Sequence, residues 1–148
     1  MVDVMKVKFI KIREGAHTPS RGSDLAAGYD LYACIDRVIA ITPHTTVQIG
    51  TGLAITPPEG YFGAIFARSG LATKQGLRPA NCVGVCDEDY TGEYIVPLHN
   101  DTDEIHFVGN GDRIAQLVFL PYVDAEWEET NALEETDRGA GGFGSTGV

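Results

Sequence analysis

The sequence predicts an all-β fold, a jelly-roll-like sandwich or barrel with one short helix and a flexible C-terminal arm. Apolar and polar residues alternate along several short runs, as they do in half-buried strands. Turn-forming residues separate these runs by roughly 8–12 positions, and the 148 residues include 18 glycines and 7 prolines. A chain of this length forms a single domain that needs no disulfide or metal to fold.

The expected strands can be justified in chain order. Residues 7–12 form a short apolar-rich run. In the run 28–34, positions 29, 31 and 33 are apolar and lie on one side. Residues 47–55 alternate throughout, which indicates one continuous strand. Four shorter alternating runs and one nearly continuous apolar run complete the set: 62–66, 83–85, 94–98, 105–107 and 114–120.

One stretch is expected to be helical. Residues 69–75 lack strand alternation, and Gly76 behind them is suited to a helix C-cap. Because the stretch is short, the sequence predicts only one or two turns of helix.

The end of the chain differs in composition from the rest. Residues 124–137 hold seven acids and no lysine or arginine, and residues 139–148 hold five glycines. A disordered terminus is one interpretation. The other is a lid over an anionic aromatic ligand, since the segment carries a cation, an aromatic ring and hydroxyls: Arg138, Phe143, Ser145 and Thr146. The chain thus divides into a β domain at 1–137 and an arm at 138–148.

Composition excludes several classes of function. The chain carries 11 Lys and Arg against 21 Asp and Glu, a net charge of −10, which argues against stable nucleic-acid binding. Its longest apolar run, at 31–35, is far shorter than the ~20 residues of a membrane helix. The N-terminal residues lack the apolar core of a signal peptide. Three cysteines, an odd number without zinc-site spacing, favour a reduced, cytoplasmic location.

A first candidate site lies at Arg68-Ser69-Gly70, between a predicted strand and the predicted helix. The N-terminus of a helix presents unpaired N–H groups, and the arginine and serine add further donors. Such a segment suits a phosphate. The alternative is that Ser69 only caps the helix.

A second candidate is the acidic stretch 84–94, which reads as a β-hairpin with Asp87, Glu88 and Asp89 near its tip. Crowded like charges do not stabilise a hairpin. One interpretation is a solvated loop; the other is that one carboxylate acts as a general base on water. Asp87 is the preferred base, because it follows two apolar residues that are expected to be buried.

Two further polar residues interrupt predicted strands. Gln116 lies within the most apolar run, so its amide must be hydrogen-bonded, either by the backbone or by ligand oxygens. Asp30 is out of phase with its apolar neighbours, and it is either simply exposed or faces a cation.

Histidines and cysteines suggest no chemistry of their own. The four histidines lack neighbours that would indicate a metal site, and each is expected on the surface. Cys82 and Cys86 are four positions apart, which would place them on one face of a strand in a packing role.

Five segments occur in an order and approximate spacing that resemble the five motifs of the homotrimeric dUTP pyrophosphatase (dUTPase) family. They are Ala-Gly-Tyr-Asp-Leu at 27–31, Ala-Arg-Ser-Gly-Leu-Ala at 67–72, Gly-Val-Cys-Asp-Glu-Asp-Tyr-Thr-Gly-Glu at 84–93, Gly-Asp-Arg-Ile-Ala-Gln-Leu at 111–117 and Arg-Gly-Ala-Gly-Gly-Phe-Gly-Ser-Thr-Gly at 138–147. Each motif alone is weak, but five in order are specific. Ala67 and Cys86 depart from the usual pattern, and neither replaces a reacting group.

The resemblance implies a jelly-roll-like trimer with three active sites at subunit interfaces, each closed by a neighbour's C-terminal arm. The implied reaction is Mg²⁺-dependent hydrolysis of dUTP to dUMP and pyrophosphate, with in-line attack of water on the α-phosphorus. This activity would keep uracil out of DNA and supply dUMP for thymidylate synthesis.

The resemblance also assigns roles to residues. Asp87 would be the general base. The phosphates of the substrate would hold most of the metal's coordination, and Asp30 would support the site and contact the metal through its water shell. The other residues would bind substrate. Those expected at the phosphates are Arg68, Ser69, Gly70, Gln116, Arg138, Gly144, Ser145 and Thr146. Those expected around the uracil and sugar are Asn81, Val85, Cys86, Tyr90, Ile95 and Phe143.

Competing interpretations remain at this point. A dCTP deaminase on the same fold would need a group that activates water at C4 of the base, and it would release ammonia. A binding or signalling module could keep the fold without turnover, and a second, regulatory role with a protein partner stays open. A carbohydrate-binding jelly roll would expose aromatic platforms, whereas Trp127, the one tryptophan, lies in the acidic segment.

Overall fold

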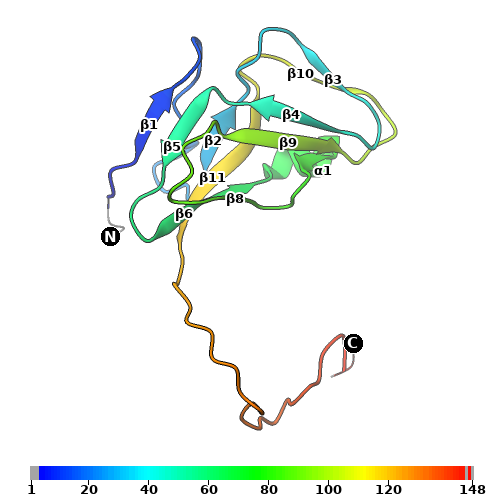
Figure 1. Cartoon of the computed structure of the whole chain (residues 1–148). Coiled ribbons are helices and arrows are strands. Elements are labelled where there is room, and N and C mark those ends of the chain that lie inside the picture. Colours follow the sequence, from blue (N-terminus) through cyan, green and yellow to red (C-terminus); the bar gives the residue numbers. More distant parts are fainter. Residues whose placement is uncertain (1–3, 146, 148) are drawn as a thin grey trace.

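The computed structural model describes residues 4–145 and 147, and these build a β-sandwich with one short helix (Figure 1). The predicted all-β fold class is confirmed. The elements in chain order are β1 Lys8–Lys11, β2 Tyr29–Tyr32, β3 Ile39–Ile41, β4 Thr46–Gly50, β5 Leu53–Thr56, β6 Tyr61–Phe66, α1 Ser69–Gln75, β7 Leu77–Pro79, β8 Gly84–Cys86, β9 Ile95–Asn100, β10 His106–Val108 and β11 Arg113–Pro121.

The sandwich consists of two main antiparallel sheets and two ribbons. One sheet has the strand order β2-β11-β6-β8 and the other β4-β9-β7, while β1 pairs with β5 and β3 with β10. Fully buried side chains from both sheets meet in one core, including Leu31 and Leu117 from the first and Ile49 and Leu98 from the second. The described sheets do not close on themselves, so the architecture is a sandwich rather than a barrel.

Two of the predicted strands show what alternation can and cannot indicate. In β2, Leu31 is fully buried and its neighbours are half-buried, as expected. The predicted strand at 47–55 is wrong as one element: Gly52, with a φ of +69°, separates β4 from β5. β5 is buried on both faces for its first three residues, so its side chains do not alternate in burial.

The helix begins and ends where the sequence predicts. Gly76 has a φ of 63°, and its N–H donates to the Ala72 carbonyl at 3.1 Å, which ends α1. Arg68 occupies the N-cap position, and Ser69 is the first helical residue. The alternative that Ser69 caps the helix is therefore wrong, and its side chain stays available at the start of α1.

The predicted hairpin at 84–94 is not a hairpin. β8 pairs with β6 in the four-stranded sheet, whereas β9 pairs with β4 and β7 in the three-stranded sheet. Residues 87–93, called the acidic loop below, therefore connect the two sheets. Cys82 precedes β8 with a φ of 62°, so it does not share a strand face with Cys86.

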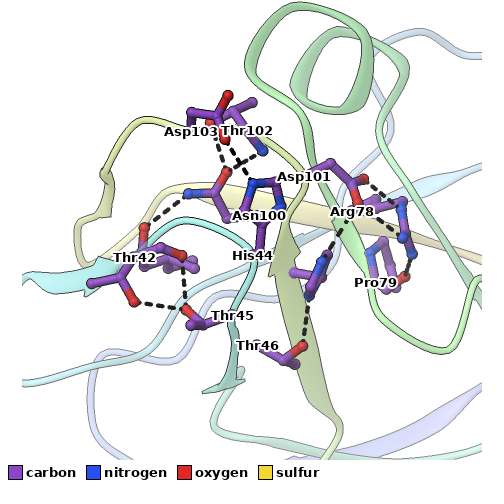
Figure 2. Close-up of polar contacts among 12 residues, drawn as sticks. Thr42, His44, Thr45, Thr46, Arg78, Pro79, Asn100, Asp101, Thr102 and Asp103 are labelled. Atoms are coloured by element: carbon purple, nitrogen blue, oxygen red, sulfur yellow. Dashed lines mark hydrogen bonds and ion pairs between the residues drawn. The ribbon is translucent and has the colours of Figure 1, made fainter.

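A network of polar side chains ties the three-stranded sheet together around the end of β9 (Figure 2). Arg78 on β7 donates two hydrogen bonds to Asp101, at 2.6 and 3.0 Å. Buried Asn100 donates to the Ile41 and Glu104 carbonyls at 3.0 and 2.7 Å. His99 and His106 are half-buried at this end of the molecule, so the prediction that every histidine lies on the surface is wrong for these two.

The segment after β11 extends away from the sandwich in Figure 1, coloured orange to red. Between Tyr122 and Ser145 the structure assigns neither helix nor strand. Its large apolar side chains are almost fully exposed; they are Val123, Trp127, Leu133 and Phe143. Among the described residues, none of the helices is long and apolar enough to cross a membrane.

Candidate functional site

A polar pocket of about 740 Å³ lies where β2, β11 and the end of β6 meet. It brings together five of the predicted phosphate and metal residues: Asp30, Arg68, Ser69, Gly70 and Gln116. These residues come from three separate sequence segments. They adjoin because Asp30, Gln116 and Phe66 occupy the same register position on adjacent strands, and Arg68 follows two residues after Phe66.

Asp30 organises the charges of this pocket. Its Oδ1 accepts a hydrogen bond from Arg68 Nε at 2.8 Å, and its Oδ2 lies 3.6 Å from Arg113 Nη1. Of the two alternatives left open for Asp30, the structure supports the one in which it faces a cation. Two guanidinium groups against one carboxylate leave the pocket positive within an acidic protein, so it is suited to an anion.

Gln116 links the floor of the pocket to the loop that carries Arg68. Its Nε2 donates to the Ala67 carbonyl at 2.8 Å, so the backbone supplies one of the partners that its burial requires. Gly28 leaves the space that this side chain needs, because a Cβ there would lie 2.2 Å from Gln116 Oε1 and 3.1 Å from its Cδ.

Substituting Gly28, which lines the pocket, should therefore disturb it by displacing Gln116. In Gly28→Ala, the new methyl group forces the Gln116 amide away from Ala67. We expect hydrolysis of dUTP, the substrate that the resemblance implies, to slow about tenfold. The control is Gly22→Ala, at another glycine that lines the pocket but where a Cβ would meet no atom within 4 Å. Steady-state kinetics and melting curves of the two variants check the prediction. Equal activity of the two variants would contradict the assignment of Gln116 to the site.

The acidic loop forms a second group of predicted site residues. Glu88 Oε2 accepts hydrogen bonds from the Tyr122 hydroxyl at 2.6 Å and the Gly60 N–H at 3.0 Å. These two donors lower the pKa of the Glu88 carboxyl, the tyrosine hydroxyl having the larger effect. Glu88 is thus an anchor of the loop, whereas Asp87 and Asp89 are exposed. This distinction favours Asp87 or Asp89 over Glu88 as a base.

One reason given for choosing Asp87 is wrong. Val85 is 63% exposed and Cys86 is half-buried, so the pair before Asp87 is not a buried one. Burial nevertheless raises the pKa of the Cys86 thiol to about 11. The thiol is protonated at neutral pH, and the reactive thiolate is scarce.

The remaining loop residues line the surface around β8 and the start of β9. Asn81, Val85, Tyr90 and Ile95 are all exposed there. The hydroxyl of Tyr90 donates to the Glu93 carbonyl at 2.9 Å, which holds its ring beside the loop. Exposed backbone and apolar groups of this kind are suited to a planar base and a sugar.

The two groups of residues are far apart within one chain. Asp30 lies on β2, at one edge of the order β2-β11-β6-β8, and Asp87 follows β8 at the other edge. Three strand spacings of about 4.8 Å and four residues of about 3.3 Å separate them, roughly 19 Å in all. Figure 1 shows the same separation, with α1 and the acidic loop at different ends of the sheet. The arginine pocket and the acidic loop are therefore separate within one chain, and they are called the cationic and the acidic half-site below.

The described residues of the arm contact neither half-site in the single chain. Arg138 Nε donates to the Gly141 carbonyl at 2.8 Å within a local turn, and Phe143 is fully exposed with a φ of 51°. Gly144 and Ser145 are exposed beside it. Thr146, also predicted for the site, lies outside the described residues.

Sequence reasoning missed the two other side chains in the pocket lining that can ionise, Arg113 and Cys82. Arg113 reaches Asp30 from β11, and Cys82 lines the rim with an exposed thiol. Arg113 belongs to the same Gly-Asp-Arg segment as the predicted Gln116, and its charge could have been paired with Asp30. Cys82 carried no such signal, because its position depends on the left-handed turn before β8.

The fold and the pocket together define a β-sandwich protein with a cationic half-site and a separate acidic half-site. The family model described as dUTPase matches residues 14–147, and the chain belongs to the dUTPase family.

Curated relatives agree over nearly the whole chain. The deoxyuridine 5'-triphosphate nucleotidohydrolase of Desulfitobacterium hafniense is 48% identical over 145 residues, covering 97% of this chain and 96% of the relative. That of Yarrowia lipolytica is 44% identical, covering 97% and 90%. Among solved structures, a Staphylococcus bacteriophage 80alpha dUTPase with dUpNHpp is similar at 27% identity with a TM-score of 0.85, covering 98% of this chain and 100% of that one.

Proposed function

We propose that this protein hydrolyses dUTP to dUMP and pyrophosphate. The observation that carries the proposal is the pair of half-sites, one cationic around Arg68 and one acidic around Asp87, on a chain of the dUTPase family. Hydrolysis of a nucleoside triphosphate needs cations that bind the phosphates and a base that accepts a proton from the attacking water. The two half-sites supply these two functions separately.

The active site is shared between subunits of a homotrimer. Roughly 19 Å separates Asp87 from the arginine pocket in one chain, whereas a base must approach an attacking water to within ~3 Å. A neighbouring chain that places its acidic loop against the pocket completes the site. The apolar side chains exposed along 123–133 support the same conclusion, since a neighbouring subunit would cover them.

Within this shared site, each residue has a definite task. Asp87 of one chain accepts a proton from the water that attacks the α-phosphorus in line, and pyrophosphate leaves. Arg68, Ser69 and Gly70 of another chain bind the phosphate chain, and Gln116 contacts phosphate oxygens. The arm closes the site, with Arg138 at the terminal phosphate and Phe143 stacked on uracil. Gly144, Ser145 and Thr146 donate further hydrogen bonds to the phosphates.

The residues present fit a metal that is held mainly by substrate. Among the described residues, no group of three or more His, Cys, Asp or Glu could enclose an ion. Both oxygens of Asp30 already face guanidinium groups, so its contact with a metal would pass through water. Mg²⁺ prefers oxygen ligands and retains waters, and when bound it neutralises charge on the triphosphate. Asp30 orients Arg68, and it would also orient the water shell of a bound ion.

Removal of Mg²⁺ should thus affect catalysis but not folding. With excess EDTA we expect turnover to fall at least about tenfold, while the melting temperature of the ligand-free protein changes by less than about 1 °C. Kinetics and thermal melts with EDTA, then with added Mg²⁺, measure both. A large loss of melting temperature would instead indicate a structural metal held by the chain itself.

Selectivity is proposed to reside in the surface around β8. Backbone groups near Val85, Cys86 and Ile95, together with Asn81, hydrogen-bond the pairing edge of uracil. Close packing there leaves no space for the 5-methyl group of thymine, and Tyr90 packs where the 2′-hydroxyl of a ribose would lie. Clashes of this kind discriminate against wrong substrates more strongly than a lost contact does.

In the cell, this activity would keep uracil out of DNA and supply dUMP for thymidylate synthesis. We propose a cytoplasmic location and no stable nucleic-acid binding, which the net charge of −10 supports.

A pyrophosphate-release assay across dUTP, UTP, dTTP and dCTP, with and without Mg²⁺, tests the function. We expect turnover of dUTP at least ~10²-fold faster than that of the others. Ammonia from dCTP would indicate a deaminase instead. Binding of dUTP without turnover would indicate a module that has lost catalysis.

A further inference from the structure

Tyr94 is a fully buried tyrosine directly behind the acidic loop. Its side chain is 1% exposed, and its backbone is tied to the neighbouring segment on both sides. The Tyr94 N–H donates to the Leu53 carbonyl at 2.8 Å, and Thr51 Oγ1 donates to the Tyr94 carbonyl at 2.6 Å. The ring therefore has a fixed position in the core.

The hydroxyl of Tyr94 does not explain why a tyrosine stands there. Within the described part of the chain it has no hydrogen-bond partner. It faces the Cys86 thiol and the backbone of Gly63, where a Cβ would lie 3.0 Å from the hydroxyl oxygen. Burial raises the pKa of this hydroxyl, which stays protonated. The Cys86 thiol beside it is at most a weak hydrogen-bond partner, so the hydroxyl contributes little and the ring is the useful part of the side chain.

The ring supports Tyr90 from below. The two ring centroids are 6.3 Å apart with planes inclined by 28°, a stacked arrangement. On another side Tyr90 rests against Gly92, where a Cβ would lie 2.4 Å from the Tyr90 hydroxyl oxygen and 2.6 Å from its Cζ. Tyr90 is 43% exposed, so part of its side chain remains accessible to a ligand.

We propose that Tyr94 is a positioning residue that sets the height of the Tyr90 ring and thereby the selectivity of the site for deoxyribose over ribose. This inference rests on the proposed function. A ring that sinks into the core would make space for a 2′-hydroxyl, whereas a ring held up by Tyr94 excludes it. Tyr94 acts through Tyr90 and touches no substrate itself.

The test compares kcat/KM for dUTP and UTP in a set of variants. Tyr94→Leu keeps an apolar core side chain but removes the ring, and we expect the dUTP to UTP ratio to fall roughly threefold to tenfold. Tyr94→Phe keeps the ring and should retain the wild-type ratio. Val96→Ala, at a fully buried position two residues further on, should lower the melting temperature and leave the ratio unchanged.

Gly92→Ala displaces Tyr90 from its other side without altering the core, and it replaces Tyr94→Leu as the test if that variant does not fold. Its dUTP to UTP ratio should also change by at least about threefold. An unchanged ratio in Tyr94→Leu or Gly92→Ala would overturn the inference, as would a reduced ratio in Tyr94→Phe. Wild-type protein that turns over neither nucleotide would refute the proposed function instead, so the two failures are distinguishable.

Discussion

Replacing Asp87 by asparagine is expected to lower kcat for dUTP by ~10²–10⁴-fold while KM changes little. The amide keeps the size and shape of the carboxylate but cannot accept the proton of the attacking water. Asp87 is exposed at the end of β8, where a neighbouring chain can present a phosphate, so the substitution should not disturb the fold. Single-turnover and steady-state kinetics, with a melting curve, measure the effect.

The two acids that directly follow Asp87, Glu88 and Asp89, are the matched controls. Glu88→Gln removes the charge that strengthens the hydrogen bonds to Gly60 and Tyr122, and we expect a loss of activity below about tenfold. Asp89→Asn should behave like the wild type. Near-normal turnover in Asp87→Asn together with a large loss in Asp89→Asn would move the role of base to Asp89.

Truncation after Asp137 should reduce kcat/KM for dUTP by at least ~10²-fold, because the arm closes the site, positions the phosphates and excludes water. The melting temperature should change by no more than about 2 °C, since every strand precedes the arm and Phe143 is fully exposed. Full activity of the truncated protein would contradict the lid, and a lost melting transition would show that the arm is structural.

Single substitutions in the arm should reveal one closure event. Arg138→Ala and Phe143→Ala should each lose part of the activity that truncation removes. Both side chains offset the conformational entropy that the glycine-rich arm loses when it closes. Because they act through this one step, their losses should not add in the double variant. Strictly additive losses would indicate two independent contacts.

Local sequence signals predicted those elements whose burial follows a regular period or whose end is marked by a capping residue. The alternation around Leu31 located β2, and Gly76 located the end of α1. β3 and β7 have three residues each and are formed by pairing with distant strands, so no local period indicates them. The hairpin prediction failed for the same reason, since partner strands from elsewhere in the chain separate β8 from β9.

The candidate site was predictable as a set of residues but not as an arrangement. Motifs indicated Arg68, Asp30 and Gln116, and the structure places them in one pocket. The separation of Asp87 from that pocket depends on strand order, which no short motif carries. The anchoring of Glu88 by Tyr122 was likewise hidden, because the two residues are 34 positions apart.

Complementation between two inactive variants tests the shared active site most directly. Asp87→Asn and Arg68→Ala are each expected to be inactive as pure proteins. When equal amounts are co-refolded into mixed trimers, turnover should recover to about one quarter of the wild-type value, because half of the chains retain Arg68 and half of their neighbours retain Asp87. Activity that remains at the level of the two separate variants would contradict a site built from more than one chain.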